Sequence, residues 1–276
     1  MITVSKMSFN YPRRSNLFDG LSLRLPAGEI IGLLGRNGVG KSTLIKLLSS
    51  LLDPQQGEIS FQGKALVPSA ELYSHLMVVP EEFSLPKVTV ENFVRHTAPL
   101  YPAFSREQFD AYSKELEVDC TMRFDRMSMG QRKKAYLAFA LACNAELLLL
   151  DEPTNGLDIT AKAALRSILA SYADESKTIL ISTHQAHDIE NLVDRVVILE
   201  GGQALINQRV SELQSCFGFC VVGSREAIYS QQSVAGSVGI WVADEDEEGR
   251  FDLELMFNAA IKATSEVCSV IAQKLG

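Results

Sequence analysis

Long apolar runs are missing from this sequence. Its most apolar stretch, residues 135–150, is interrupted by Asn144 and Glu146, and it falls short of the ~20 residues that a membrane-spanning helix needs. The N-terminal residues also lack the apolar centre of a secretory signal peptide. We therefore expect a chain that stays in the cytosol and has no membrane span of its own.

Cysteine is scarce and its spacing is uninformative. The chain has five cysteines, an odd number without any CxxC pair: Cys120, Cys143, Cys216, Cys220 and Cys268. Zinc sites and disulfide frameworks normally show closely spaced or even-numbered cysteines. Reduced and mostly buried thiols are the interpretation that we favour.

Basic charge is in deficit. There are 26 Lys and Arg against 34 Asp and Glu, a net charge of −8, and sequence-independent binding of DNA or RNA needs net basic surface. We expect no nucleic-acid partner. Hydrophobic residues make up 46% and charged residues 22% of the chain, which excludes an intrinsically disordered protein. A length of 276 residues predicts one large domain, or one domain with a small companion.

Short apolar strands alternate with helical stretches over most of the chain. Apolar runs of this kind, separated by helices, are typical of strands buried on both faces of a mainly parallel sheet. The strands expected in that sheet are Ile30–Leu34, Leu147–Leu150, Thr178–Ser182 and Val196–Leu199, with helices over Ser42–Leu52 and Ile159–Tyr172. Segments 2–9 and 21–25 alternate apolar and polar residues, which predicts an antiparallel portion near the N-terminus.

Two further regions differ from this alternating pattern. Residues 87–142 are mainly helical, and Ser105 with Gln108 resembles a capping box that starts a helix running to about Glu117. After Leu213 we expect strands at 216–222 and 238–242, a solvated acidic turn at 244–249, and one amphipathic helix over Leu253–Leu275. The predicted division is therefore 1–213 and a small C-terminal extension, 214–276.

A glycine-rich loop carries the strongest chemical signal. Residues 35–43 read GRNGVGKST and match the pattern G-x-x-x-x-G-K-[ST] between a strand and a helix. Glycines allow backbone N–H groups to point inward, and a helix N-terminus adds positive potential, so such a loop forms a nest for a polyphosphate. Lys41 supplies a charge to the β and γ phosphates, and the Ser42 hydroxyl is a ligand for Mg²⁺. The residues predicted to bind nucleotide here are Gly35, Asn37, Gly38, Gly40, Lys41, Ser42 and Thr43.

A buried strand supplies the acidic counterpart of this loop. Residues 146–153 read ELLLLDEP and deliver Asp151 to the carboxyl end of a strand, where ligands of open α/β sheets bind. Asp151 is predicted to hold Mg²⁺ together with Ser42. Glu152 is predicted to orient or deprotonate an attacking water.

With these two motifs in place, residues 1–213 resemble the ATP-binding subunit of an ABC transporter. MSMGQ at 127–131 is similar to the family signature, NGLD at 155–158 to its D-loop, and His184 to its switch histidine, which contacts the γ-phosphate. Tyr11 is similar to the aromatic residue that stacks on adenine, although a core-packed ring is the alternative. The basic run 132–134 is interpreted as a solvated face beside the signature helix.

The resemblance implies the fold and the remaining site residues. The fold expected is α/β: a P-loop NTPase core with a mainly parallel sheet, an antiparallel N-terminal portion, a helical subdomain at about 87–142 and a small α+β extension. Two subunits would pack head to tail, so that ATP in one is covered by the signature of the other. The covering residues implied are Ser128, Gly130 and Gln131, with Asp158 as a further nucleotide contact.

Two residues depart from the family pattern. Glu81 stands where the family usually has a glutamine, and Met129 replaces the first glycine of the signature. A carboxylate at position 81 is still a possible Mg²⁺ ligand, but it adds negative charge beside a triphosphate. The implied catalytic pair is Glu152 and His184, and the implied metal ligands are Ser42, Asp151 and Glu81.

The resemblance also implies partners. A separate transmembrane permease would dock on the helical region, and the second ATPase would be a copy of this chain or a relative. The protein would then lie on the inner face of the membrane. Residues 251–260 resemble extensions of exporter-type subunits. Two alternatives stay open, a soluble ABC-type ATPase acting on ribosomes or DNA, and a regulator that closes on ATP with little hydrolysis; the presence of Glu152 and His184 argues against the second.

Overall fold

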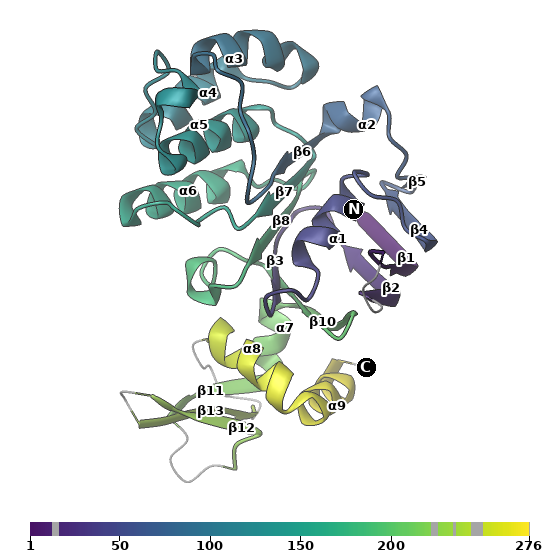
Figure 1. Cartoon of the computed structure of the whole chain (residues 1–276). Helices are drawn as coiled ribbons and strands as arrows, with labels where there is room; N and C mark the ends of the chain where they lie inside the picture. Colours follow the sequence, from purple (N-terminus) through teal and green to yellow (C-terminus); the bar gives the residue numbers. More distant parts are fainter. Residues whose placement is uncertain (13–16, 222–225, 234–235, 244–250, 276) are drawn as a thin grey trace.

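The computed structural model describes residues 1–12, 17–221, 226–233, 236–243 and 251–275 (Figure 1). The acidic turn expected at 244–249 lies outside the described residues, and so does the side chain of Cys220. The other four cysteines are free thiols, with Cys143 and Cys216 buried. Within the described ranges no single helix is long and apolar enough to span a membrane.

A six-stranded sheet forms the centre of the molecule, in the order β10-β9-β3-β8-β7-β6. Five of its strands are parallel and β10 pairs antiparallel with β9. The bounds are β3 Glu29–Gly35, β6 Leu76–Val79, β7 Leu147–Asp151, β8 Thr178–Thr183, β9 Arg195–Glu200 and β10 Gln203–Arg209. Every residue of β3, β7 and β8 is buried, which confirms the mainly parallel sheet predicted from the apolar runs.

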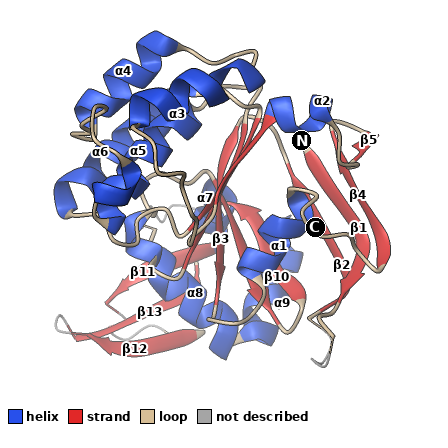
Figure 2. Cartoon of the chain, turned by 45° about the horizontal axis from the view of Figure 1, so that its top comes forward, coloured by secondary structure: helices blue, strands red, loops and turns tan. Residues whose placement is uncertain are grey.

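An antiparallel sheet lies beside it, in the order β2-β1-β4-β5. Its strands are β1 Ile2–Phe9, β2 Phe18–Leu25, β4 Gln56–Phe61 and β5 Lys64–Ala65. Helix α1, Lys41–Leu48, lies between the two sheets (Figure 2). Its buried residues, among them Leu44 and Leu48, share one apolar core with residues of both sheets. The predicted helix at 42–52 thus begins one residue earlier and ends four residues sooner.

The helical region covers one end of the central sheet (Figure 1). Its helices are α3 Val90–Thr97, α4 Arg106–Glu115 and α5 Met129–Ala142, while α2 Ala70–His75 precedes β6. The capping box expected at Ser105 is only half formed. The Ser105 hydroxyl accepts the Gln108 N–H at 3.2 Å, but the Gln108 side chain accepts a hydrogen bond from Asn144 instead.

The C-terminal extension differs from its prediction in three places. Cys216 ends helix α7, Val210–Cys216, and the strand expected there is β11, Phe217–Val221. Strand β12, Tyr229–Ser233, was not predicted, because four of the five residues in YSQQS are polar; it pairs with β13, Gly236–Val242. The final helix is two helices, α8 Leu253–Lys262 and α9 Thr264–Leu275, which meet at 111°. The Thr264 hydroxyl donates to the Ala260 carbonyl at 2.6 Å and so satisfies one of the last carbonyls of α8.

The extension shares its core with the rest of the chain. Phe217, Leu253 and Met256 belong to the same buried cluster as Ile198 and Leu213. Helix α8 packs against β9 and against the short helix η3, Ala186–Asp188. The Leu253 N–H donates to the carboxylate of Glu190 at 3.0 Å. The extension is therefore joined to the loop that follows β8, although the division at residue 213 itself stays a prediction.

A buried carboxylate fastens the start of β3 to its neighbours. Glu29 is 6% exposed, and its two oxygens accept hydrogen bonds from Arg195 and Arg209, each at 2.6 Å from the arginine Nε. The Arg195 side chain is 13% exposed and that of Arg209 is 55% exposed. Arg195 is the first residue of β9 and Arg209 the last of β10. Their contacts with Glu29 therefore hold these two strands to the start of β3.

Candidate nucleotide-binding and catalytic site

The glycine-rich loop joins β3 to α1 and has the backbone that a phosphate nest requires. Gly38 and Gly40 have φ values of +82° and +111°, which side chains with a Cβ rarely adopt. A Cβ on Gly40 would also stand 2.7 Å from the Phe18 ring. Gly40 directly precedes α1, so the positive end of that helix faces the loop.

Lys41 is folded back onto this loop. Its Nζ donates to the Gly35 carbonyl at 2.7 Å, and the side chain is buried. Burial lowers the pKa of Lys41, while the negative charges of Glu152, Asp151 and Glu81 act in the opposite direction. Lys41 is thus a buried amine on the loop, and the nearby carboxylates favour its charged form.

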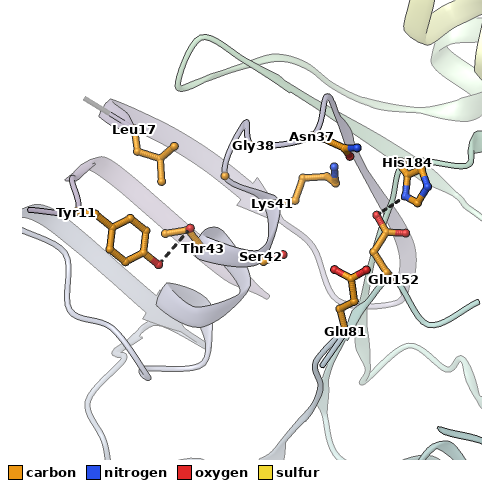
Figure 3. Close-up of a pocket in the computed structure, with 11 residues that line it drawn as sticks. Tyr11, Leu17, Asn37, Gly38, Lys41, Ser42, Thr43, Glu81, Glu152 and His184 are labelled. Atoms are coloured by element: carbon orange, nitrogen blue, oxygen red, sulfur yellow. Dashed lines mark hydrogen bonds and ion pairs between the residues drawn. The ribbon is translucent and has the colours of Figure 1, made fainter. Parts of the chain in front are cut away.

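The acidic counterpart ends strand β7 at the same edge of the sheet. Asp151 is 5% exposed and accepts a hydrogen bond from the Ser182 hydroxyl of β8. At Glu152 the chain turns with φ +47°, a left-handed conformation that is uncommon for residues other than glycine. The Glu152 N–H donates to the Ser182 carbonyl at 3.0 Å. This turn carries the Glu152 side chain away from β7 and into the cavity (Figure 3).

Glu152 and His184 form a pair. His184 follows β8, and its Nδ1 lies 2.8 Å from Glu152 Oε1. The other carboxylate oxygen, Oε2, is buried and has no hydrogen-bond partner among the described residues. Burying a carboxylate oxygen without a hydrogen-bond partner costs free energy, because the oxygen loses its contact with water. A molecule that enters the cavity and donates a proton or a hydrogen bond to this oxygen would remove that cost.

A cavity of about 360 Å³ collects these groups. Figure 3 shows Glu152, Glu81 and His184 on one side, Tyr11 and Leu17 on the opposite side, and Lys41 with Ser42 between them. The predicted residues that line it are Tyr11, Asn37, Gly38, Gly40, Lys41, Ser42, Thr43, Glu81, Glu152 and His184. Leu17 lines it as well and was not predicted, since a single apolar residue after a basic loop carries no recognisable signal.

The Tyr11 ring forms the wall opposite the carboxylates. Its hydroxyl lies 3.4 Å from the Thr43 hydroxyl, and its ring meets Phe9 edge to face at 5.1 Å between centroids. A half-buried ring held in this way can offer its remaining face to a base. Adenine stacking on Tyr11 remains a prediction.

Gly35 and Asp151 stand behind the cavity wall. Gly35 ends β3, where an added Cβ would lie 2.6 Å from Val39 Cγ1, and it lines a neighbouring cavity of about 490 Å³ that Arg36, Glu254 and Asn258 also border. Asp151 is buried under the Ser182 hydroxyl. Neither residue is among those that line the nucleotide cavity, although residues directly after them, such as Asn37 and Glu152, do line it.

The signature residues stand away from this cavity, at the start of α5. Ser128 and Gln131 form a complete capping box, with the Gln131 side chain 2.8 Å from the Ser128 N–H and the Ser128 hydroxyl 3.2 Å from the Gln131 N–H. Met129 is 64% exposed. Their predicted contact with nucleotide requires a second subunit, and it stays a prediction.

Asp158 also lies outside the cavity, as the N-cap of α6, Ile159–Tyr172. Its carboxylate accepts the Ala161 N–H at 2.8 Å and the Thr160 hydroxyl at 2.6 Å. The hydrogen bond from the Thr160 hydroxyl makes the largest contribution to lowering the pKa of Asp158. Together with the Ala161 N–H and Lys134 it brings this pKa to about 2. A helix-capping role accounts for the contacts that the structure describes.

The basic run at 132–134 is not a solvated face, and this prediction was wrong. Lys133 is 3% exposed, and the Lys134 side chain is 12% exposed and lies 3.3 Å from Asp158. Lys133 stands four residues before the buried Leu137 on α5, which places it on the inner face of the helix. That spacing was the signal in the sequence that could have identified it.

The donor set suits a magnesium ion better than a transition metal. Among the described residues no three His, Cys, Asp or Glu side chains cluster closely enough to hold a metal by themselves. Mg²⁺ is typically bound through one or two carboxylates together with hydroxyl, water and phosphate oxygens. Asp151, Glu81 and the Ser42 hydroxyl match that chemistry once a phosphate supplies the remaining oxygens.

A phosphate nest, a lysine and a buried glutamate paired with a histidine define a P-loop nucleoside triphosphate hydrolase. The sequence model of the family described as ABC transporter matches residues 18–155. The chain belongs to this family, and it is an ATP hydrolase.

Known proteins resemble the chain over most of its length. The ABC transporter ATP-binding protein NatA of Bacillus subtilis is 30% identical over 77% of this chain and 91% of its own. Nod factor export ATP-binding protein I of Neorhizobium galegae is 33% identical over 70% of this chain and 58% of its own. A solved ATP-binding subunit of an ABC transporter superposes with a TM-score of 0.70 at 26% identity, over 77% of this chain and 91% of that one.

Proposed function

We propose that this chain is the ATP-hydrolysing subunit of a membrane transporter of the export type, and that it works as one of two paired ATPases. The observation that carries the proposal is the buried Oε2 of Glu152, which no described residue hydrogen-bonds, in a cavity that also holds Lys41, Ser42 and His184. Its relatives are named as transporter ATP-binding proteins, one of them for export, which supports the choice of transport and of its direction.

Hydrolysis assigns a role to each group in the cavity. The nest and Lys41 hold the β and γ phosphates. The Glu152 carboxylate orients a water molecule and accepts its proton as the water attacks the γ-phosphorus, while His184 holds the Glu152 side chain and contacts the γ-phosphate. Ser42, Asp151 and Glu81 are the residues that would hold Mg²⁺, which would neutralise phosphate charge. Tyr11 and Leu17 pack against the adenine base at the opposite wall.

Pairing converts the reaction into movement. Ser128, Gly130 and Gln131 of one subunit would contact the γ-phosphate held by the other, so loss of that phosphate removes contacts that exist only in the closed pair. Shifting a population from 1:99 to 99:1 takes about 5.5 kcal/mol. Several charge-assisted hydrogen bonds at about 1.5–3 kcal/mol each supply this difference.

The Glu152→Gln variant tests the catalytic assignment. We expect turnover to fall by at least about a hundredfold, since the amide cannot accept the proton of the water, while ATP still binds and pairs the subunits. Phosphate release gives the rate, and size-exclusion chromatography with ATP gives the pairing. Glu146→Gln is the control, because Glu146 stands just before the opposite end of β7 and lies 2.9 Å from His75. Parental turnover in Glu152→Gln would refute the assignment.

The membrane partner needs a separate experiment. Native membranes are extracted in mild detergent, and the tagged chain is recovered with whatever accompanies it. We expect a polytopic membrane protein to copurify, and to be lost when exposed residues of the helical region such as Leu100, which is 67% exposed, are replaced by charged ones. Copurification of ribosomal proteins or DNA would support the soluble alternative instead.

A further inference from the structure

Lys133 of helix α5 is a buried cation whose partners are backbone carbonyls. Its Nζ donates to the Glu152 carbonyl at 2.6 Å and to the Asn155 carbonyl at 3.3 Å, and the residue is 3% exposed. Burial lowers the pKa of Lys133, and the charges of Glu81, Glu152 and Asp151 oppose that effect. An ammonium group is rarely kept out of water unless it has such partners.

The turn that Lys133 holds is the one that aims Glu152. The Asn155 N–H donates to the same Glu152 carbonyl at 3.2 Å and closes the turn 152–155. Glu152 itself is in the left-handed region, a conformation that persists only where its surroundings enforce it. On one side these surroundings are Ser182 and His184. On the other side the carbonyl of Glu152 is fixed by Lys133.

The same lysine connects two parts of the site that are remote in sequence. It follows Gln131 by two residues, in the helix whose first turn is the capping box of the signature. Through Asn155, whose side-chain amide donates to Glu81 Oε1 at 3.1 Å, the turn is also joined to the segment after β6. A movement of α5 therefore reaches the backbone of Glu152 through a single hydrogen-bonded group.

We propose that Lys133 is a positioning residue for ATP hydrolysis. Its amino group holds the turn 152–155 so that the Glu152 carboxylate faces the attacking water. Because Lys133 stands on α5, this alignment depends on the position of that helix. The inference rests on the proposed role of Glu152. Lys133 is not among the described residues that line the nucleotide cavity. Its effect therefore falls on the rate of the chemical step and not on ATP binding.

A matched pair of substitutions separates the donor from the side-chain volume. Met and Gln are similar in length, but only Gln can donate a hydrogen bond to the turn. We expect Lys133→Met to lower kcat by about 10- to 100-fold, since displacing a catalytic group by about 1 Å can cost up to about a hundredfold. The KM for ATP should stay within about twofold, because the nest is untouched. Lys133→Gln should fall between this variant and the parent.

Lys177 supplies the control for a buried lysine. Its side chain is 13% exposed, and its Nζ donates to the Tyr172 carbonyl at 2.9 Å, just before the amino end of β8. Lys177→Met removes a lysine–carbonyl bond at the opposite end of the sheet. We expect Lys177→Met to lower the unfolding temperature and to leave kcat at the parental value. If loss of stability alone lowered kcat, kcat would fall in both lysine variants.

The measurements are steady-state ATPase kinetics, nucleotide affinity by fluorescence titration and thermal unfolding, all on the full chain. Parental kcat in folded Lys133→Met, or an equal fall of kcat in Lys133→Met and Lys177→Met, would overturn the proposal. If Lys133→Met does not fold, the Gln variant decides: a lowered kcat with unchanged ATP affinity supports the role, and a parental kcat overturns it.

The double variant Lys133→Met/Glu152→Gln keeps the two proposals apart. If Lys133 acts through Glu152, the double variant is no slower than Glu152→Gln alone; a further tenfold loss would overturn the positioning role. A Glu152→Gln variant with parental turnover instead refutes the catalytic role of Glu152, whatever Lys133 does.

Discussion

Glu81 places a negative charge at the cavity that is proposed to hold a triphosphate. A neutral side chain at this position would not repel the phosphates. Glu81 is exposed, lines the nucleotide cavity with Lys41 and Ser42, and accepts a hydrogen bond from the Asn155 side chain. Glu81→Gln removes one negative charge and retains an oxygen that can accept that bond and ligate a metal. We therefore expect ATP to bind more tightly to Glu81→Gln than to the parent.

The size of this gain follows from the exposure of the carboxylate. Two unit charges roughly 7 Å apart in water interact by about 0.6 kcal/mol, and exposed charge pairs contribute about 0.2–1 kcal/mol when measured. A gain of about 0.5–1 kcal/mol corresponds to a Kd about two- to fivefold lower. It should be larger when Mg²⁺ is chelated, because the metal no longer neutralises the phosphates, and it should shrink in 1 M salt, where the screening length is about 3 Å.

Isothermal titration of both proteins with ATP, with Mg²⁺ and with a chelator, measures the difference. Glu82→Gln is the control: Glu82 is also exposed, but it is not among the described residues that line the cavity, so the Kd of this variant for ATP should change little. An unchanged or weaker affinity of Glu81→Gln in the chelated sample would refute the electrostatic reasoning. Weaker binding that occurs only with Mg²⁺ would show that the carboxylate charge is needed for the metal.

Two further predictions concern stability. Arg195 and Arg209 bind Glu29 at the same 2.6 Å but differ in exposure, so Arg195→Met should lower the free energy of unfolding by about 3 kcal/mol and Arg209→Met by clearly less, because solvent screens the exposed pair; equal losses in urea titrations would contradict this. The folded-state pKa of Asp158, about 2, lies below its ordinary 3.8, so the carboxylate stabilises the fold above about pH 4 and this contribution is lost as the pH falls toward 2. The difference in unfolding temperature between the parent and Asp158→Ala should shrink over that interval, and a constant difference down to pH 2 would contradict the assignment.

Strong periodicity and local motifs made much of the fold predictable. The helix at 159–172 and the strand at 2–9 have the predicted bounds, because apolar spacing and an N-cap act over a few residues. Ten predicted residues line the cavity, since the loop and the strand ends that carry them are encoded locally.

Features that depend on tertiary contacts were missed. The apolar spacing continues from α8 into α9, so the sequence pattern does not reveal the break at Ala263. Lys133 was assigned to solvent by its charge, yet the carbonyls that bind it belong to a turn about twenty residues further along the chain. Leu17 reaches the cavity only because β2 passes beside the glycine loop. Such partners become visible only after the chain has folded.

The core shared by the extension and the ATPase limits how this protein can be divided or recombined. Truncation after Leu213 would uncover the side of β9 against which α8 packs, together with the loop around Glu190. A fragment of this kind would be prone to aggregate. Exchange of the extension between relatives would likewise require a matching loop after β8, the loop that carries Glu190, so the two segments are expected to be inherited as one unit.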